Sequence, residues 1–218
     1  MDTVKYYDDK YYAWQKEISS FGGIANTFKF EDSIKKTDTL VDFGCGGGFL
    51  LSCLNAHLKI GIEPNTDAHA DITANNVIPF STTADCIKEY GHNFADVIIS
   101  NHALEHTTNP LQELMNLHDL LKKGGIINFV VPCDSIRYKY RSNDINQHLF
   151  SWSPMNLGNL FTHAGFSVIS SKPCYHKWPR QYLTIQKVFG WSIFHFIARF
   201  YCHLERSWFQ TQIIATKN

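Results

Sequence analysis

The sequence predicts an α/β fold in which a mostly parallel sheet carries helices on both of its faces. Short apolar runs alternate with amphipathic stretches along the chain, as in successive strand–helix units. The first such run, 39–43, ends in the glycine-rich stretch 44–48 and leads into a second apolar segment. A strand that turns through glycines into a helix is the usual start of a doubly wound sheet. We expect seven strands, the last of them antiparallel.

The elements of the first half follow from periodicity and from start and stop signals. Residues Val4–Ser19 repeat apolar side chains at helical spacing, and Gly22-Gly23 is expected to end this helix. Asn65 or Thr66 is placed to cap a later helix. The expected strands are 39–43, 59–62, 77–80 and 96–100, with helices at about 47–55, 66–75 and 84–90.

The second half continues this alternation but contains two additional segments. Asn109-Pro110 predicts a helix start, and Lys122-Lys123-Gly124-Gly125 predicts its end. A fifth strand covers 126–131 and should end at Pro132. A helix at about 153–165 precedes a sixth strand, 166–170, and we expect the last strand, 212–216, at an edge of the sheet. The stretches 134–150 and 172–209 are expected to be insertions, the second rich in aromatic residues.

Composition limits the classes of function. The 218 residues suit a single domain, and the apolar fraction of 44% can fill a sizeable core. The formal net charge is zero, which argues against binding along a nucleic acid. The six cysteines show no metal-binding spacing, so we expect free thiols and no metal site. No signal-peptide pattern or long apolar run is evident, which predicts a cytoplasmic protein.

The glycine-rich turn indicates which ligand it binds. Its core is Asp-x-Gly-x-Gly-x-Gly, at Asp42, Gly44, Gly46 and Gly48. A dinucleotide-binding turn would need glycine at position 49, which is Phe49. An acid this close to the turn suits a ligand with hydroxyls, an amine and net positive charge. S-adenosylmethionine has these properties, whereas a nicotinamide dinucleotide is disfavoured.

Several motifs in order resemble class I S-adenosylmethionine-dependent methyltransferases, in the small-molecule branch that includes ubiquinone-type and sugar O-methyltransferases. The motifs are the stretches 41–48, 61–64, 83–85, 96–106, 120–125, 148–150 and 164–166. The resemblance covers the chain to about Ser171. It implies a Rossmann-like sheet, S-adenosylmethionine as cofactor and S-adenosylhomocysteine as product. We treat residues 1–218 as one methyltransferase domain with an N-terminal helical lid, 1–25.

The resemblance also implies a set of cofactor-binding residues. Glu63 would accept hydrogen bonds from the ribose hydroxyls. Asp85 would meet the adenine edge, although a helix-capping role is equally consistent with its position. The full set is Tyr11, Gln15, Asp42, Gly44, Cys45, Gly46, Glu63, Pro64, Ala84, Asp85, Asn101 and His102. Tyr11 and Gln15 could instead belong to a helix that only packs on the domain.

Methyl transfer to a hydroxyl gains from a base that removes the proton, and histidine suits this role. Of the eleven histidines, His106 is the first candidate, because the resemblance to sugar methyltransferases implies that a histidine in this loop can face the nucleophile. His148 is the second, because an insertion after the fifth strand can contact substrate. Alternatively, Glu105 and His106 hold their loop by hydrogen bonds.

The leading hypothesis is methyl transfer to a small-molecule hydroxyl, such as that of a sugar, glycolipid or quinone-like intermediate. A second is a catalytically silent protein of the same fold that binds a partner through its aromatic insertion. The apolar stretch Val188–Cys202 within this insertion suits a substrate lid, a homodimer contact or a peripheral membrane contact with a lipid-linked substrate.

Overall fold

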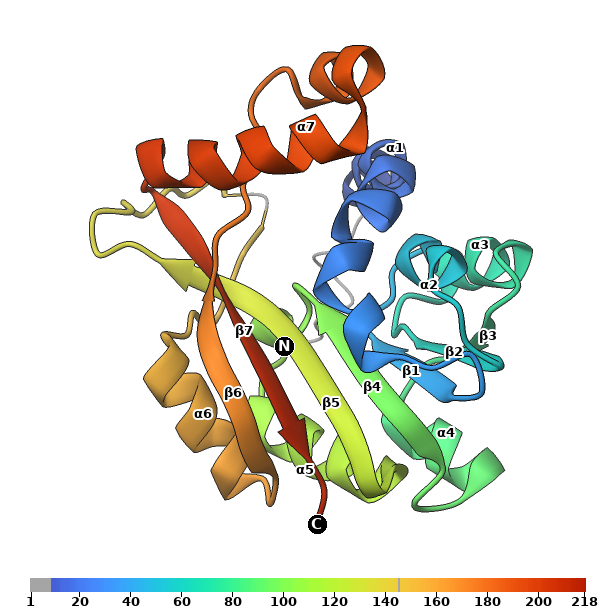
Figure 1. The fold of residues 1–218 in the computed structure, drawn as a ribbon. Coiled ribbons are helices and arrows are strands. Elements are labelled where there is room, and N and C mark those ends of the chain that lie inside the picture. Colours follow the sequence, from blue (N-terminus) through green and yellow to red (C-terminus); the bar gives the residue numbers. More distant parts are fainter. Residues whose placement is uncertain (1–8, 145) are drawn as a thin grey trace.

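Seven strands form one sheet with helices packed against it (Figure 1). This computed structural model describes the backbone of residues 9–144 and 146–218, and the side chains of the same residues from Ile18 onward. The strands are β1 (Thr39–Phe43), β2 (Leu58–Ile62), β3 (Ile78–Phe80), β4 (Ala95–Asn101), β5 (Leu121–Asp134), β6 (Ser167–Cys174) and β7 (Trp208–Thr216). The helices are α1 (Asp9–Asn26), α2 (Phe49–Cys53), α3 (His69–Ala74), α4 (Thr83–Tyr90), α5 (Pro110–Leu120), α6 (Pro154–His163) and α7 (Tyr182–Leu204).

The strand order is β3-β2-β1-β4-β5-β7-β6. Strands β1 to β5 are parallel to one another, and β7 is antiparallel to both β5 and β6. Successive strands are added on one side of β1 up to β3 and on its other side from β4 onward. Doubly wound sheets bind their ligands at such a switch in strand order. The predicted seven-stranded, mostly parallel, Rossmann-like sheet is therefore confirmed.

Successive side chains of a strand point to opposite faces of the sheet, and each face carries its own hydrophobic core. Val41 and Phe43 of β1 belong to a core that includes buried residues of α5 and α6. Leu40 belongs to the opposite core, which includes buried residues of α2 and α3. Neighbouring residues of a strand point to opposite faces, so a strand that is buried throughout must feed both cores.

The helix at the start of the chain does not end at Gly22-Gly23 as the sequence predicts. It continues through both glycines to Asn26. The glycines serve close packing here: a Cβ on Gly23 would lie 2.7 Å from the carbonyl oxygen of Phe49. Gly23 thus lets α1 pack directly against the first turn of α2, while a Cβ on Gly22 would lie 3.3 Å from Trp178, and these contacts outweigh the low helix propensity of glycine. Val4, the predicted start, lies outside the described residues.

The last strand is internal, so its expected position at an edge is wrong. β7 lies between β5 and β6, and Ile213 and Ala215 are fully buried. β5 also continues past Pro132 to Asp134. Because β4 ends at Asn101, Pro132 lies where β5 has only one neighbouring strand and a missing N–H disturbs little.

The aromatic insertion between β6 and β7 forms α7, which lies beside α1 at the top of Figure 1. Its limits are narrower than the predicted 172–209, because Cys174 and Gln210 already pair in the sheet. Phe21 of α1 contacts Trp191 and Phe194 of α7, with ring centroids 5.0 and 5.3 Å apart. Among the described residues, no helix is long and apolar enough to span a membrane.

Candidate active site

Backbone hydrogen bonds connect the glycine-rich turn after β1 to the end of β2. The backbone N–H groups of Gly44 and Cys45 both donate to the carbonyl of Ile62. Gly44, Gly46 and Gly48 all have positive φ, which explains the spacing of glycines at alternate positions. A Cβ on Gly44 would lie 2.1 Å from the Cβ of Ala103, so this glycine also admits the loop after β4.

Asp42 carries a buried carboxylate that faces the pocket beside this turn. It is 2% exposed, and its Oδ1 has no hydrogen-bond partner among the described residues. Burial raises its pKa well above the ordinary value, and the charge of Glu63 adds to the shift. An unpaired buried carboxylate costs free energy unless something compensates it. A ligand with donor groups or positive charge would provide that compensation.

Glu63 sits at the end of β2 and spans the turn. Its Oε2 accepts a hydrogen bond from the N–H of Gly46 at 2.9 Å, and its Oε1 accepts one from Asn65 at 3.0 Å. Burial raises its pKa, while these two backbone donors act in the opposite direction. The carboxylate is therefore positioned next to the glycine-rich turn, where the resemblance places a ribose.

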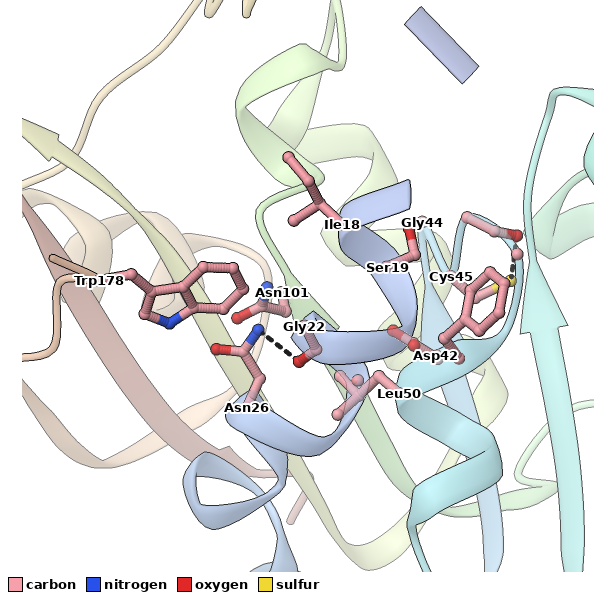
Figure 2. A pocket seen from close by; sticks show the side chains of 14 residues that line it. Ile18, Ser19, Gly22, Asn26, Asp42, Gly44, Cys45, Leu50, Asn101 and Trp178 are labelled. Carbon is pink, nitrogen blue, oxygen red and sulfur yellow. Dashed lines mark hydrogen bonds between the residues drawn. The ribbon is translucent and has the colours of Figure 1, made fainter. Parts of the chain in front are cut away.

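A pocket of about 200 Å³ lies between the turn and α1. Figure 2 shows α1 running between Asn101 and Trp178 on one side and Asp42 and Cys45 on the other. Ser19, Gly22 and Asn26 of α1 line the opposite wall, and Trp178 closes one end. Asn26 donates to the carbonyl of Gly22 at 2.9 Å, which keeps its amide at the pocket wall. An N-terminal helix thus covers the pocket, as a lid would.

The pocket includes some of the sequence-predicted cofactor residues and not others. Asp42, Gly44, Cys45, Gly46 and Asn101 line it. Residues that the sequence did not indicate also line it: Ile18, Ser19, Gly22, Gly23, Asn26, Gly47, Phe49, Leu50 and Trp178. The Gly22-Gly23 pair was a signal for close approach that was interpreted as a helix stop. The side chains of Tyr11 and Gln15 lie outside those that the structure describes.

The other predicted residues whose side chains are described do not line the pocket. The Asp85 carboxylate accepts a hydrogen bond from the Thr82 hydroxyl at 2.6 Å, and Thr82 in turn accepts from the Asp85 N–H at 3.1 Å. Thr82 is the N-cap of α4, and Asp85 supports it from the first turn, so Asp85 is not itself the capping residue and its adenine contact stays a prediction. Ala84 and Pro64 are exposed next to Asp85 and Glu63 respectively.

Three histidines surround a fully buried glutamate at the end of β4. Glu105 belongs to the 3-10 turn Leu104–His106 and is 0% exposed. His102 Nδ1 lies 3.2 Å from Glu105 Oε1, and His148 Nε2 lies 3.9 Å from the same oxygen. The rings of His106 and His148 meet edge to face with centroids 5.1 Å apart. We call Glu105, His106 and His148, with His102, the histidine cluster.

The backbone holds the histidine cluster next to the pocket. The N–H of Leu149 donates to the carbonyl of Glu105 at 2.9 Å, which ties the segment after β5 to the turn after β4. Burial lowers the pKa of His106, and the charge of Glu105 opposes the shift. A neutral imidazole can accept a proton or bind a metal ion. Both predicted catalytic residues, His106 and His148, are thus brought together.

A buried polar chain links the pocket to the aromatic insertion. Lys29 is 7% exposed, and its Nζ donates to Asn101 Oδ1 at 3.1 Å and to Gln210 Oε1 at 2.7 Å. Burial lowers the pKa of Lys29 to about 8. His176 Nε2 lies 3.0 Å from His195 Nδ1, and burial lowers the pKa of His176 to about 3. The interior therefore holds this histidine neutral.

A family profile described as "Methyltransferase domain" matches residues 9–171, about three quarters of the chain. The chain belongs to this family. The predicted resemblance to class I S-adenosylmethionine-dependent methyltransferases is therefore confirmed, and with it the predicted cofactor at the level of the family. The matched range includes the glycine-rich turn, Glu63 and the histidine cluster, and it ends before α7 and β7.

Relatives and solved structures agree with this family. A ubiquinone biosynthesis O-methyltransferase of Ruegeria pomeroyi is 35% identical over 95 residues, 40% of this chain and 38% of the relative. The chain thus matches under two fifths of the length of such curated relatives. A methyltransferase structure from Thermotoga maritima has a TM-score of 0.69 at 15% identity and full coverage of both chains. The 4+2 cyclase SpnF has a TM-score of 0.60 at 16% identity, over 94% of this chain and 83% of the cyclase.

Proposed function

We propose that this chain transfers the methyl group of S-adenosylmethionine to a hydroxyl group of a small molecule, such as a sugar, a glycolipid or a quinone-like intermediate. One observation carries the proposal: the histidine cluster lies beside the pocket of Asp42, whose Oδ1 has no hydrogen-bond partner among the described residues. The loop that contains His102 and Glu105 touches the glycine-rich turn through Ala103. The name of the Ruegeria pomeroyi relative supports oxygen as the acceptor atom.

The cofactor supplies a methyl group that is activated by the positive charge on its sulfur. Asp42 offers a buried negative charge to it, and Glu63 is placed to accept hydrogen bonds from its ribose hydroxyls. The acceptor hydroxyl loses its proton at the histidine cluster, in the simplest form to His106. Its oxygen bonds to the methyl carbon while the carbon–sulfur bond breaks and leaves its electron pair on sulfur. Alignment of the reactants under α1 accounts for much of the expected rate.

Cofactor binding can be tested by isothermal titration with S-adenosylhomocysteine and, separately, with NAD. We expect saturable binding of S-adenosylhomocysteine at one molecule per chain and none of NAD. Saturable binding of NAD in place of the sulfur compound would overturn the proposal.

The role of the histidine cluster can be tested by turnover on a panel of sugar, lipid and catechol-type acceptors. His106→Ala should lower turnover by about 100-fold or more, as loss of a proton acceptor does, with little change in S-adenosylhomocysteine affinity. His57→Ala is the matched control, because His57 is exposed and precedes β2. If turnover and affinity fall together in the His106 variant, its role is to hold the loop.

A catalytically silent or differently reactive protein of this fold is the second candidate. The cyclase SpnF shows that the fold is compatible with chemistry other than methyl transfer. Saturable cofactor binding with no methylated product from any acceptor in the panel would favour this candidate.

A lipid-linked acceptor is favoured by one further observation. After a kink at Gly190, α7 exposes apolar side chains at helical spacing: Ile193, Phe196, Phe200 and Leu204. Such a stripe suits the interface of a membrane. Co-sedimentation with anionic liposomes should be reduced in the double variant Phe196→Ser/Phe200→Ser. Concentration-dependent dimerisation without liposome binding would assign the stripe to a homodimer contact instead.

A further inference from the structure

The histidine cluster has the geometry of a metal site. One ligand atom from each of Glu105, His106 and His148 lies within 4.8 Å of the others. Ligands that share a metal ion at the usual bond lengths of about 2.0–2.2 Å lie about 3–4 Å apart, so a small adjustment would bring these atoms onto one ion. The three residues come from the turn after β4 and from the segment between β5 and α6.

A second, independent observation is the state of the Glu105 carboxylate. Glu105 is 0% exposed, and neither of its oxygens has a hydrogen-bond partner among the residues that the structure describes. Its Oε1 lies 3.2 Å from His102 Nδ1, a contact without hydrogen-bond geometry, and 3.9 Å from His148 Nε2, which is too long for a hydrogen bond. A buried carboxylate normally has partners that repay its lost hydration. A cation between the carboxylate and the two imidazoles would supply that missing interaction.

We propose that Glu105, His106 and His148 bind one divalent first-row transition-metal ion. Imidazole nitrogens favour such ions over Mg²⁺, which prefers oxygen ligands. Three protein ligands leave coordination positions open, as in catalytic rather than structural sites. His102, with Nδ1 3.2 Å from Glu105 Oε1, is placed to orient the carboxylate rather than to bind the ion. The separation of the ligands along the chain explains why cysteine and histidine spacing predicts no metal.

The role of the ion, unlike its binding, rests on the proposed function. Open positions on the ion can bind two neighbouring oxygens of an acceptor, which favours a vicinal diol or catechol. A hydroxyl bound to a dication loses its proton more readily, so the proton passes to solvent water and the oxygen then attacks the methyl carbon. His106 would hold the ion instead of accepting the proton.

The test is titration of the metal-stripped, tag-free full chain with Co²⁺, followed by visible absorption and by isothermal titration. We expect one saturable site per chain, displaced by Zn²⁺. Glu105→Gln and His148→Gln should each weaken Co²⁺ binding by about 10-fold or more, a loss seen even for residues that only support metal ligands. His57→Gln, the exposed control, should bind as the unaltered chain does.

Several outcomes would overturn the site. These are the absence of saturable Co²⁺ binding, unchanged affinity in both cluster variants, or saturation by Mg²⁺ in preference to Co²⁺. Circular dichroism checks that each variant is folded, and two variants guard against the failure of one.

Titration with S-adenosylhomocysteine separates this proposal from the proposed function. If the chain binds S-adenosylhomocysteine but no metal ion, only the metal-site proposal is rejected. If the chain binds a metal ion but not S-adenosylhomocysteine, only the proposed methyl transfer is rejected.

Discussion

The two halves of the sheet build their parts of the site in different ways. In the N-terminal half, 39–101, a strand runs directly into the turn that carries the ligand-facing groups, and Asp42 and Glu63 each follow or end a strand. In the C-terminal half, 121–216, the structure depends on segments that are distant in sequence. His148 contacts Glu105 from the segment after the neighbouring strand, and Trp178 lines the pocket from beyond β6. Local motifs thus shape the glycine-rich side of the pocket, whereas long-range contacts complete its far end and the histidine cluster.

The largest expected effect tests how firmly the insertion is anchored. Phe194 is fully buried between α1 and α7, whereas Phe196 on the same helix is 72% exposed. Phe194→Ala should lower the free energy of unfolding by about 3–5 kcal/mol, the usual cost of emptying a buried aromatic site. Phe196→Ala should change it by less than about 0.5 kcal/mol. Urea denaturation measures both. Equal effects would mean that α7 is not held by this cluster.

The next effect compares a glycine from each half. Gly44 and Gly190 have φ of +74° and +77°, but only Gly44 has an atom within reach of an added Cβ. Gly190, with ψ of 178°, lies in a region almost restricted to glycine, so Gly190→Ala should cost about 1–3 kcal/mol from backbone strain alone. Gly44→Ala should cost about 1–3 kcal/mol more, because Ala103 must move. Urea denaturation measures the free energy of unfolding of both variants. Similar decreases would show that the turn after β1 accommodates the added methyl group by a small shift.

A smaller effect concerns the ribose assignment in the N-terminal half. Glu63→Ala should weaken S-adenosylhomocysteine binding by about 1–3 kcal/mol, as expected for the loss of a charged hydrogen-bond acceptor. Asp85→Ala serves as the comparison. If Asp85 only supports the Thr82 cap of α4, this variant should bind S-adenosylhomocysteine with unchanged affinity. Isothermal titration gives both values. An unaffected Glu63 variant would contradict the assignment.

The most gradual effect, spread over several pH units, is a pH dependence that arises in the C-terminal half. The folded pKa of His176 is lowered to about 3 by burial and by the charges of Lys29, His195 and Arg199. The unfolded chain binds a proton here below about pH 6.5, so stability is lost as the pH falls from about 6.5 to 3, by about 1 kcal/mol per unit. His176→Asn should flatten this slope in urea titrations at several pH values. The exposed His203→Asn control should retain it.

The sequence predicted most of the N-terminal half because its signals are local. Thr39–Phe43 is buried along its whole length, and Asn65 caps the turn that follows Glu63 as expected. Gly22-Gly23 was misinterpreted because a glycine pair that ends a helix and one that admits a neighbouring helix look alike. Only the position of Phe49 in space separates the two.

The C-terminal half was less predictable because strand order is not a local property. The pattern in 212–216 indicates a strand but not its neighbours. Polar residues at the start of β7 are buried because distant groups satisfy them: Thr211 donates to the carbonyl of Trp152, and Gln210 donates to that of His176. His106 and His148 were each predicted separately as catalytic residues from the sequence. Only the structure shows that both lie around the buried Glu105.

The internal place of β7 has a consequence for synthesis on the ribosome. β6 touches β5 only through β7, so residues 167–174 have no strand to pair with until 208–216 have left the exit tunnel. A nascent chain halted before Trp208 would carry two unpaired strand edges, those of β5 and β6. Such edges invite association with other chains. Until β7 has paired with both strands, these edges therefore leave the chain exposed to aggregation.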